Sequence, residues 1–447
     1  MTTSRRTFLR IAAGAGAAAG LAACGGTSGP KSSGSGGASG GSAKGGATYW
    51  YLTGAPGEGI RTNTVKRFND ANPKTPIKGT TFQNDAYKTK IKTAIGAGQG
   101  PTIIWGWGGG GLKSYVDANQ VEDLTGWFGE NAAVKDRLFP GSFGAATVDG
   151  KIYALPAETV QPIVMFYNKT NFEKIKADIP QTWEDMMALV PKFNKAGIAP
   201  FSLGGQSRWT NMMWLEFLFD RIGGPEVFQA VFDGEKDAWS NPASIKALTE
   251  IQKLIKAGGF IKGFSSITAD SNADQALMFT GKAAMMLHGT WTYGSMSSDG
   301  GDFVSGGHLG YSNFPPVAGG TGDPSNTVGN PGQYYSISSK ATAAEKDVAK
   351  NFFKTAVSSD AESKEWVAAG AIPIVNGSDS LLTGQKDEDW LKFVYGVASG
   401  AKTFAQSWDQ ALSPTAAEVL LDNIAKLFQL SITPQQFATN LNAVIGK

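Results

Sequence analysis

Between residues 47 and 105 the chain alternates short apolar runs with helical patterns, and this alternation restricts the possible folds. Apolar runs at 47–53, 77–82 and 101–105 have the length and composition of strands. Helical patterns separate them at 57–72 and at 85–98, the latter beginning at a capping Asp and ending at a Gly. The order strand, helix, strand, helix, strand predicts a parallel sheet that is covered by helices.

Further helical patterns continue along the rest of the chain. They fall at residues 182–196, 212–222, 242–257, 273–279, 343–358 and 416–430. A chain of 447 residues with 41% hydrophobic residues is long enough for two domains with cores of their own. We therefore expect an α/β protein with two lobes of about 200 residues each.

Residues 1–23 have the pattern of an export signal. Arg5 and Arg6 precede Phe8-Leu9, as in twin-arginine signals, and the uncharged run that follows is too short to span a bilayer. The sequence Leu-Ala-Ala-Cys at 21–24 resembles the lipobox of bacterial lipoproteins, in which the cysteine is acylated. Cys24 is the only cysteine in the chain. We predict lipidation at Cys24; the alternative is a cleaved secretory signal with an incidental cysteine.

A tether follows this leader at residues 24–46. The stretch 25–46 has 10 Gly and 6 Ser in 22 residues and no aromatic or branched aliphatic side chain. Such a composition cannot offset the entropy lost on ordering, so the sequence predicts a flexible linker between a membrane anchor and a folded part.

Charge and composition exclude several function classes. Without the three arginines of the leader, 37 Lys and Arg face 38 Asp and Glu, which leaves no basic surplus for nucleic acid. One cysteine and two histidines offer little for a metal site or for histidine-dependent catalysis. We expect no metal, no cofactor and no nucleic-acid partner. The 12 tryptophans instead indicate aromatic contact surfaces.

Several short motifs, taken together, carry a family resemblance. They are GKIYALP at 150–156, FYNK at 166–169, PQTWE at 180–184, FTGKAAM at 279–285 and GTW at 289–291. This set resembles the extracellular solute-binding proteins of ABC importers, in the sugar-binding family that includes maltose-binding protein. The resemblance implies a clamp of two lobes, each with a mainly parallel sheet, and three hinge crossings near 155–161, 306–315 and 369–373. Lobe one would comprise 47–157 plus 310–370, and lobe two 160–306 plus 374–447.

The same resemblance implies positions for ligand contacts. Trp291 and Trp408 fall where the family has stacking tryptophans, Trp209 where it has a stacking tyrosine, and Trp105 where it has another tryptophan. Gln161 occupies the place of a sugar-binding carboxylate, which suggests a different hydroxyl pattern. Sugars need flat aromatic platforms beside planar hydrogen-bonding side chains. For each tryptophan the alternative is burial in a core, and we expect that for Trp183 and Trp214.

The stretch GWGGGG at 106–111, which contains Trp107 and the glycine run 108–111, formally satisfies the dinucleotide-binding pattern G-x-G-x-x-G. We discount this match because any four consecutive glycines nearly satisfy the pattern. The better interpretation is a loop that lets a ligand or the opposite lobe approach closely; a purely structural loop is the alternative. Polar residues beside the platforms are candidate hydroxyl partners, with a solvated loop as the alternative: Asn84, Asp85, Glu158, Arg208, Asn330 and Gln333.

These features predict a binding protein that is not an enzyme. It would be a monomer held by lipid on the outer face of the cell membrane, as in Gram-positive bacteria. It would bind a disaccharide or short oligosaccharide of the xylo, cello, chito or malto type and deliver it to ABC permease subunits. The alternative is an exported carbohydrate-active enzyme such as a glycoside hydrolase, which needs two facing carboxylates.

Overall fold

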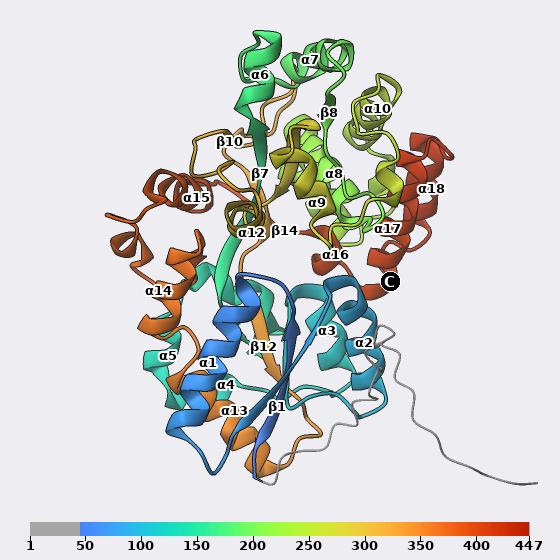
Figure 1. Ribbon diagram of the computed structural model, residues 1–447. Coiled ribbons are helices and arrows are strands. Elements are labelled where there is room, and N and C mark those ends of the chain that lie inside the picture. The colour runs from blue at the N-terminus through green and yellow to red at the C-terminus, as the bar shows by residue number, and fades with distance from the viewer. Residues whose placement is uncertain (1–44, 447) are drawn as a thin grey trace, which may run out of the picture. The chain divides into compact units, whose positions relative to one another are not determined.

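Two sheets organise residues 45–446, the part of the chain that the computed structural model describes (Figure 1). The predicted export signal, Cys24 and all but the end of the predicted tether lie outside the described residues. In the first sheet β1 pairs in parallel with β2 and β3, while β12 is antiparallel to β3 and β6. Its strands, in spatial order, are β2 (Ile77–Phe82), β1 (Ala47–Leu52), β3 (Ile103–Gly106), β12 (Gln333–Ile337) and β6 (Leu155–Ala157). The three strands expected before residue 106 are thus confirmed.

The second sheet is mixed and is built around β7 (Thr159–Asn168). This strand is antiparallel to β9, β10, β11 and β13, so the sheet departs from the mainly parallel arrangement expected for each lobe. The other strands are β14 (Phe404–Gln406), β11 (Thr327–Asn330), β9 (Ala283–Gly289), β8 (Ala199–Phe201), β10 (Leu309–Ser312) and β13 (Ile372–Pro373). A small hairpin, β4 (Thr147–Val148) and β5 (Lys151–Ile152), stands apart.

Helices cover both sheets. Around the first sheet lie α1 (Gly57–Ala71), α2 (Asn84–Gly96), α3 (Gly109–Asp117), α4 (Thr125–Glu130), α5 (Ala132–Asp136), α13 (Ala343–Thr355) and α14 (Asp360–Ala368). Around the second lie α6 (Lys169–Ile175), α7 (Trp183–Lys195), α8 (Trp209–Gly223), α9 (Pro225–Phe232), α10 (Pro242–Lys256), α11 (Ala273–Phe279), α12 (Thr292–Asp299), α15 (Glu388–Gly400), α16 (Trp408–Ala411), α17 (Pro414–Phe428) and α18 (Pro434–Asn442). Within the described residues, no helix combines the length and apolarity needed to cross a membrane.

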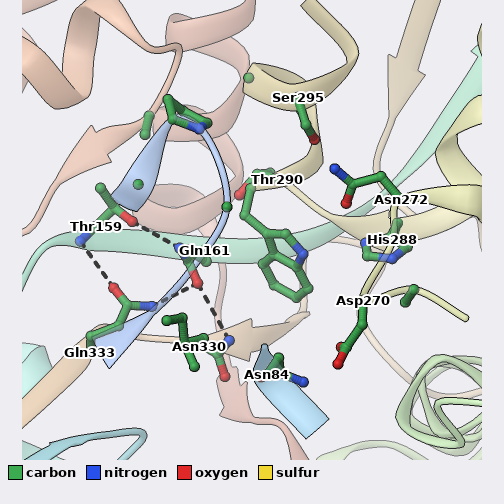
Figure 2. Close-up of a pocket in the computed structure, with 18 of the residues that line it drawn as sticks. Asn84, Thr159, Gln161, Asp270, Asn272, His288, Thr290, Ser295, Asn330 and Gln333 are labelled. Atoms are coloured by element: carbon green, nitrogen blue, oxygen red, sulfur yellow. Dashed lines mark hydrogen bonds between the residues drawn. The ribbon is translucent and has the colours of Figure 1, made fainter. Parts of the chain in front are cut away.

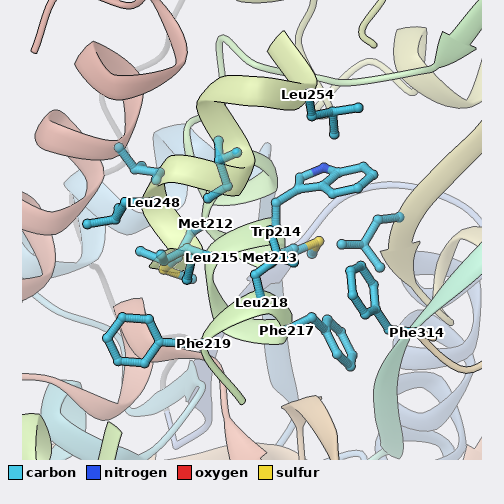
Figure 3. Close-up of a cluster of buried hydrophobic side chains, with 14 of the residues drawn as sticks. Met212, Met213, Trp214, Leu215, Phe217, Leu218, Phe219, Leu248, Leu254 and Phe314 are labelled. Atoms are coloured by element: carbon cyan, nitrogen blue, oxygen red, sulfur yellow. The ribbon is translucent and has the colours of Figure 1, made fainter. Parts of the chain in front are cut away.

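Each lobe has its own hydrophobic core, because the sheets bury their faces against different helices. Helix α8 is apolar on nearly all sides and lies at the centre of the larger core, where Trp214, Phe217 and Phe219 point in different directions (Figure 3). A helix that is hydrophobic all round must be enclosed on all sides. The expectation that Trp183 and Trp214 are core residues is confirmed, since both are buried.

The chain passes between the two sheets three times. The first crossing is at Glu158, between β6 and β7, and the third lies beside β13, whose Ile372 pairs with Val160. The second lies between β11 and β12, at residues 331–332. The expected crossing at 306–315 and the lobe boundary at 310 need correction, because β10 and β11 both pair with β7 in the second sheet.

Candidate functional site

A cavity of about 390 Å³ opens where strands of both lobes end. Residues that follow β2, β3 and β9 line it, together with the first residues of β7. Ligands of open α/β sheets bind in this position, beyond the carboxyl ends of strands. We call this cavity the cleft.

Strand β7, which begins directly after the first crossing between the lobes, presents different side chains to its two sides. Thr159 and Gln161 line the cleft, whereas Val160 between them lines a second cavity of about 950 Å³, the rear cavity. Successive side chains of a strand point to opposite faces, so one strand can wall both cavities. The rear cavity also contains Val328, Ile372 and the exposed Phe232. The polar and aromatic lining of the cleft makes it the better candidate for recognising a polar ligand.

Four of the predicted tryptophans line the cleft as two pairs, one pair on each lobe. Trp105 lies in β3 and Trp107 directly follows the strand, and their ring centroids are 4.6 Å apart with the planes at 85°. Trp209 and Trp291 belong to the second lobe, with centroids 6.1 Å apart and planes at 51°. Trp105 is only 2% exposed and belongs to the core of the first lobe, so it packs behind Trp107. The structure therefore brings together three partly buried aromatic rings, Trp107 from one wall and Trp209 and Trp291 from the other. A further tryptophan, Trp366, also lines the cleft and was not predicted.

Gly289 explains why Trp291 takes its position. A Cβ atom at Gly289 would lie 1.9 Å from Cζ3 of the Trp291 indole, far inside van der Waals contact. The indole thus covers the end of β9, and only a glycine leaves room for it. The GTW motif at 289–291 is a structural requirement for this platform.

Amide side chains form the floor of the cleft beside the hinge (Figure 2). Gln333 Nε2 donates to Gln161 Oε1 at 2.7 Å, and Asn330 Nδ2 approaches the same oxygen at 3.4 Å. Gln161 Nε2 in turn donates to Thr159 Oγ1 at 3.0 Å. The three predicted amides therefore hold one another in fixed orientations. Asn84, also predicted, lines the opposite edge of this floor.

Four of the predicted contacts need correction, because none of them lines the cleft. Trp408 is buried in the second lobe's core, where it stacks on Phe228 with centroids 4.1 Å apart and planes at 1°. Arg208 forms ion pairs with Glu418 and Asp422 on α17, which hold its side chain outside the cleft. Asp85 lies at the rim of the cleft, where its Oδ1 accepts a hydrogen bond from Trp209 Nε1 of the opposite lobe.

Glu158 is the fourth of these residues, and it organises the hinge instead. Its carboxylate accepts two hydrogen bonds from Arg61 at 2.7 Å, one from Trp105 Nε1 at 2.7 Å and one from Tyr335 at 2.6 Å. Although burial opposes the positive charge, this carboxylate raises the pKa of the Arg61 guanidinium above its ordinary value. Glu158 therefore supports Trp105 from behind and cannot itself reach a ligand.

The second lobe contributes a polar wall that the sequence analysis missed. Asp270, Asn272 and Ser295 line it (Figure 2). Gln275 also lines it and accepts a hydrogen bond at Oε1 from the Ser295 hydroxyl. Gln275 Nε2 donates to Asn272 Oδ1 at 3.0 Å. The available signal was the polar run at 270–272, directly before the predicted helix at 273–279.

Direct contacts join the lobes across the cleft. The backbone N–H of Asp85 donates to Asp270 Oδ2 at 3.0 Å, and Trp209 Nε1 donates to Asp85 Oδ1 at 3.3 Å. Lys88 pairs with Asp409 at 2.9 Å. Burial, together with the charge of Asp85, raises the pKa of Asp270. The lobes are thus in contact, and both cations at the cleft, Lys88 and Arg61, have carboxylate partners.

The glycine run at 108–111 packs directly against the second lobe. A Cβ at Gly110 would lie 2.1 Å from the carbonyl oxygen of Leu412, and one at Gly109 would lie 2.4 Å from Gln406 Oε1. This geometry supports the interpretation of the run as a place where the opposite lobe approaches closely. At Gly111 a Cβ would meet nothing within 4 Å.

Substitution of Gly110 tests this contact. We expect Gly110→Ala to hold the lobes apart, because the Leu412 carbonyl is backbone and cannot rotate away. Ligand affinity should fall by about tenfold, and small-angle scattering should give a larger radius of gyration at saturating ligand than for the wild type. Gly111→Ala is the matched control and should change neither quantity. Equal closure of both variants would contradict the assignment.

Comparison with known proteins decides the family. A sequence model of the bacterial extracellular solute-binding proteins matches residues 53–363. The chain belongs to this family. A probable sugar-binding periplasmic protein of Mesorhizobium japonicum is 28% identical over 258 residues, which are 55% of this chain and 58% of the relative. The maltotriose-binding protein of Pyrococcus abyssi is 26% identical over 240 residues, 53% of this chain and 46% of that one. The chain spans about half the length of the curated relatives it matches.

Solved structures match nearly the whole chain. One from work on xylan utilization by Caldanaerobius polysaccharolyticus has a TM-score of 0.80 and 29% identity, covering 90% of this chain and 100% of that one. A chitin oligosaccharide binding protein has a TM-score of 0.80 at 23% identity, covering 89% and 97%, and this likeness shows the fold. The predicted solute-binding family and its two-lobed α/β clamp are therefore confirmed, and the family is one of binding proteins.

Proposed function

We propose that this solute-binding protein is the lipid-anchored receptor of an ABC sugar importer and binds a disaccharide or short oligosaccharide in the cleft. The observation that carries the proposal is the presence of partly buried tryptophans on both walls, Trp107 on one and Trp209 with Trp291 on the other, above a floor of neutral amides. Aromatic faces suit the C–H faces of sugar rings, and oriented amides suit their hydroxyl groups. Because both cations at the cleft are paired, a neutral ligand fits better than an acidic one.

The mechanism follows from the two walls. A sugar docks against one lobe, and the other lobe closes on it around the three crossings. The contacts made only in the closed form favour that form, and permease subunits then recognise it. Xylo-oligosaccharides are the first candidates, since the structure from the xylan-utilizing bacterium shares 29% identity over 90% of this chain.

Calorimetry and thermal-shift assays with xylo-, malto-, cello- and chito-oligosaccharides test the proposal. We expect one series to bind and to raise the unfolding midpoint, as any ligand specific for the native state must. The same mixtures are then examined by chromatography. A hydrolysis product would favour the glycoside hydrolase alternative, and a complete lack of binding by neutral sugars would reject the sugar receptor.

The lipid anchor makes a separate prediction. Cys24→Ala should release the exported protein from membranes into the medium, because acylation of that single cysteine provides the attachment. Sugar affinity should stay unchanged, since the tether separates the cysteine from the clamp. Fractionation of cells that express each form, followed by immunoblotting, measures this. A Cys24→Ala protein that remains in the membrane fraction would contradict lipidation at this residue.

A further inference from the structure

His288 stands between the two tryptophans of the second lobe. Its ring centroid lies 5.4 Å from Trp209 with the planes at 83°, and 5.4 Å from Trp291 with the planes at 75°. Edge-to-face contacts of this kind favour one relative orientation of the rings. The histidine is 2% exposed, so protein surrounds it almost completely. Its ring therefore packs against both indoles at once.

The imidazole makes one hydrogen bond, at Nδ1, while its Nε2 and the nearby Asp274 Oδ2 are buried without a hydrogen-bond partner among the described residues. The backbone N–H of Gly289 donates to Nδ1 at 2.9 Å, which leaves the ring proton on Nε2. Nε2 lies 3.3 Å from Oδ2 of the fully buried Asp274, and Oδ1 of Asp274 accepts from the N–H of Gln275 at 2.9 Å. Space for this carboxylate exists because residue 204 is glycine, whose Cβ would lie 2.8 Å from Asp274 Oδ2.

The orientation of the indoles has a consequence for the ligand. Their planes are inclined by 51° at a centroid separation of 6.1 Å, so one flat sugar face cannot stack on both. Two sugar rings can, one on each indole. On such a wall, a second sugar ring would add to the affinity of the ligand only while the angle between the two indoles is kept.

We propose that His288, held by the backbone N–H of Gly289, is a positioning residue that sets the angle between Trp209 and Trp291 and thereby gives the cleft its preference for a disaccharide over a monosaccharide. This proposal rests on the proposed sugar-binding function. His288 acts through the two indoles. Figure 2 shows His288 on the same side of the cleft as Asp270 and Asn272, away from the amide floor.

The first test measures the ratio of disaccharide to monosaccharide affinity. Xylobiose, maltose, cellobiose and diacetylchitobiose are each titrated against their own monosaccharide by calorimetry. For the disaccharide that binds best, His288→Ala should reduce the ratio by about tenfold, because two edge-to-face contacts are lost. His288→Phe restores a ring at the same place and should recover part of the ratio. Near-ultraviolet circular dichroism of the indoles should change in the alanine variant and less in the phenylalanine variant.

The chain offers a matched control, because it contains only one other histidine. His308 lies outside the cleft, with Nδ1 3.3 Å from Thr170 Oγ1, so His308→Ala should leave the affinity ratio unchanged. With two imidazoles, nitrogen-15 NMR of the whole protein can be assigned from that variant. It should show His288 protonated on Nε2 and shifted by the disaccharide.

The outcomes separate the inference from the function on which it rests. If the wild type binds no sugar, the proposed function fails first. If the wild type prefers the disaccharide and His288→Ala keeps the full ratio, the positioning role is overturned and the function stands. A His288 that carries its proton on Nδ1 would overturn the proposed arrangement directly. If His288→Ala does not fold, His288→Phe decides alone. A His288→Phe protein that keeps its unfolding midpoint but loses the whole disaccharide-to-monosaccharide affinity ratio would also overturn positioning by the ring.

Discussion

Trp291→Ala is expected to lower sugar affinity by about 30- to 1000-fold, since the loss of an aromatic anchor from a desolvated site typically costs about 2 to 4 kcal/mol. The indole covers the end of β9 and is only partly buried, so the unfolding midpoint of the ligand-free protein should change little. Calorimetry measures the affinity and differential scanning calorimetry the midpoint. Gly289→Val should reproduce the loss, because its side chain would occupy the place of the Trp291 ring.

Trp408→Ala provides the contrast for this experiment. Trp408 is enclosed by the core of the second lobe, so its truncation should lower the free energy of unfolding by roughly 3 to 5 kcal/mol. The folded fraction should still bind sugar. If Trp291→Ala instead destabilised the protein and left binding intact, Trp291 would be a core residue and the platform assignment would be wrong.

Glu158→Ala is expected to destabilise the ligand-free protein by about 3 to 5 kcal/mol, because it leaves the Arg61 guanidinium buried without a counter-charge. Trp105 and Tyr335 would also lose their acceptor. The double variant Arg61→Met with Glu158→Gln removes both charges and keeps an acceptor oxygen. It should recover much of the loss, and urea unfolding of the single and double variants measures the coupling.

Helix α1, which carries Arg61, supplies a control for Glu158. Lys66 and Asp70 form an ion pair on α1 in which both side chains are mostly exposed. Lys66→Ala should change the free energy of unfolding by less than about 1 kcal/mol, since solvent screens such pairs. Similar losses for Glu158→Ala and Lys66→Ala would mean that burial of the Arg61 pair contributes nothing to the hinge.

The sequence predicts well where local patterns determine the structure. The strands and helices of residues 47–105 follow from hydrophobic period and from their boundary residues. The position of Trp291 was implied by the family resemblance; the residue lines the cleft, and its stacking role stays a prediction. Glu158 illustrates the limit. Its residue type suits a sugar contact, but its burial depends on Arg61, Trp105 and Tyr335, which no short segment contains. Trp408 was placed by family position, and its burial depends on α9 packing over it.

The polar wall of the second lobe was missed for the same reason. Asp270 and Gln275 flank a helix start that was predicted, but their meeting with Asn84 and Asp85 requires both lobes to be in place. The second crossing was misplaced because strands β10 and β11 look like any short apolar run. Only their pairing with β7 assigns them to a lobe. Contacts between segments that are distant in the sequence depend on the tertiary packing of the complete fold.

The rear cavity gives the protein a use as an optical sensor. It shares β7 with the cleft, so the proposed closure of the lobes should change the width of both cavities. Cys24 is the only thiol, and replacing it leaves a chain in which a single new cysteine can be labelled without side products. Phe232 is exposed and lines the rear cavity. A polarity-sensitive dye attached to the cysteine of a Phe232→Cys variant would lie at this cavity and would not contact a sugar in the cleft. Its emission would report closure while the recognition surface stays chemically untouched.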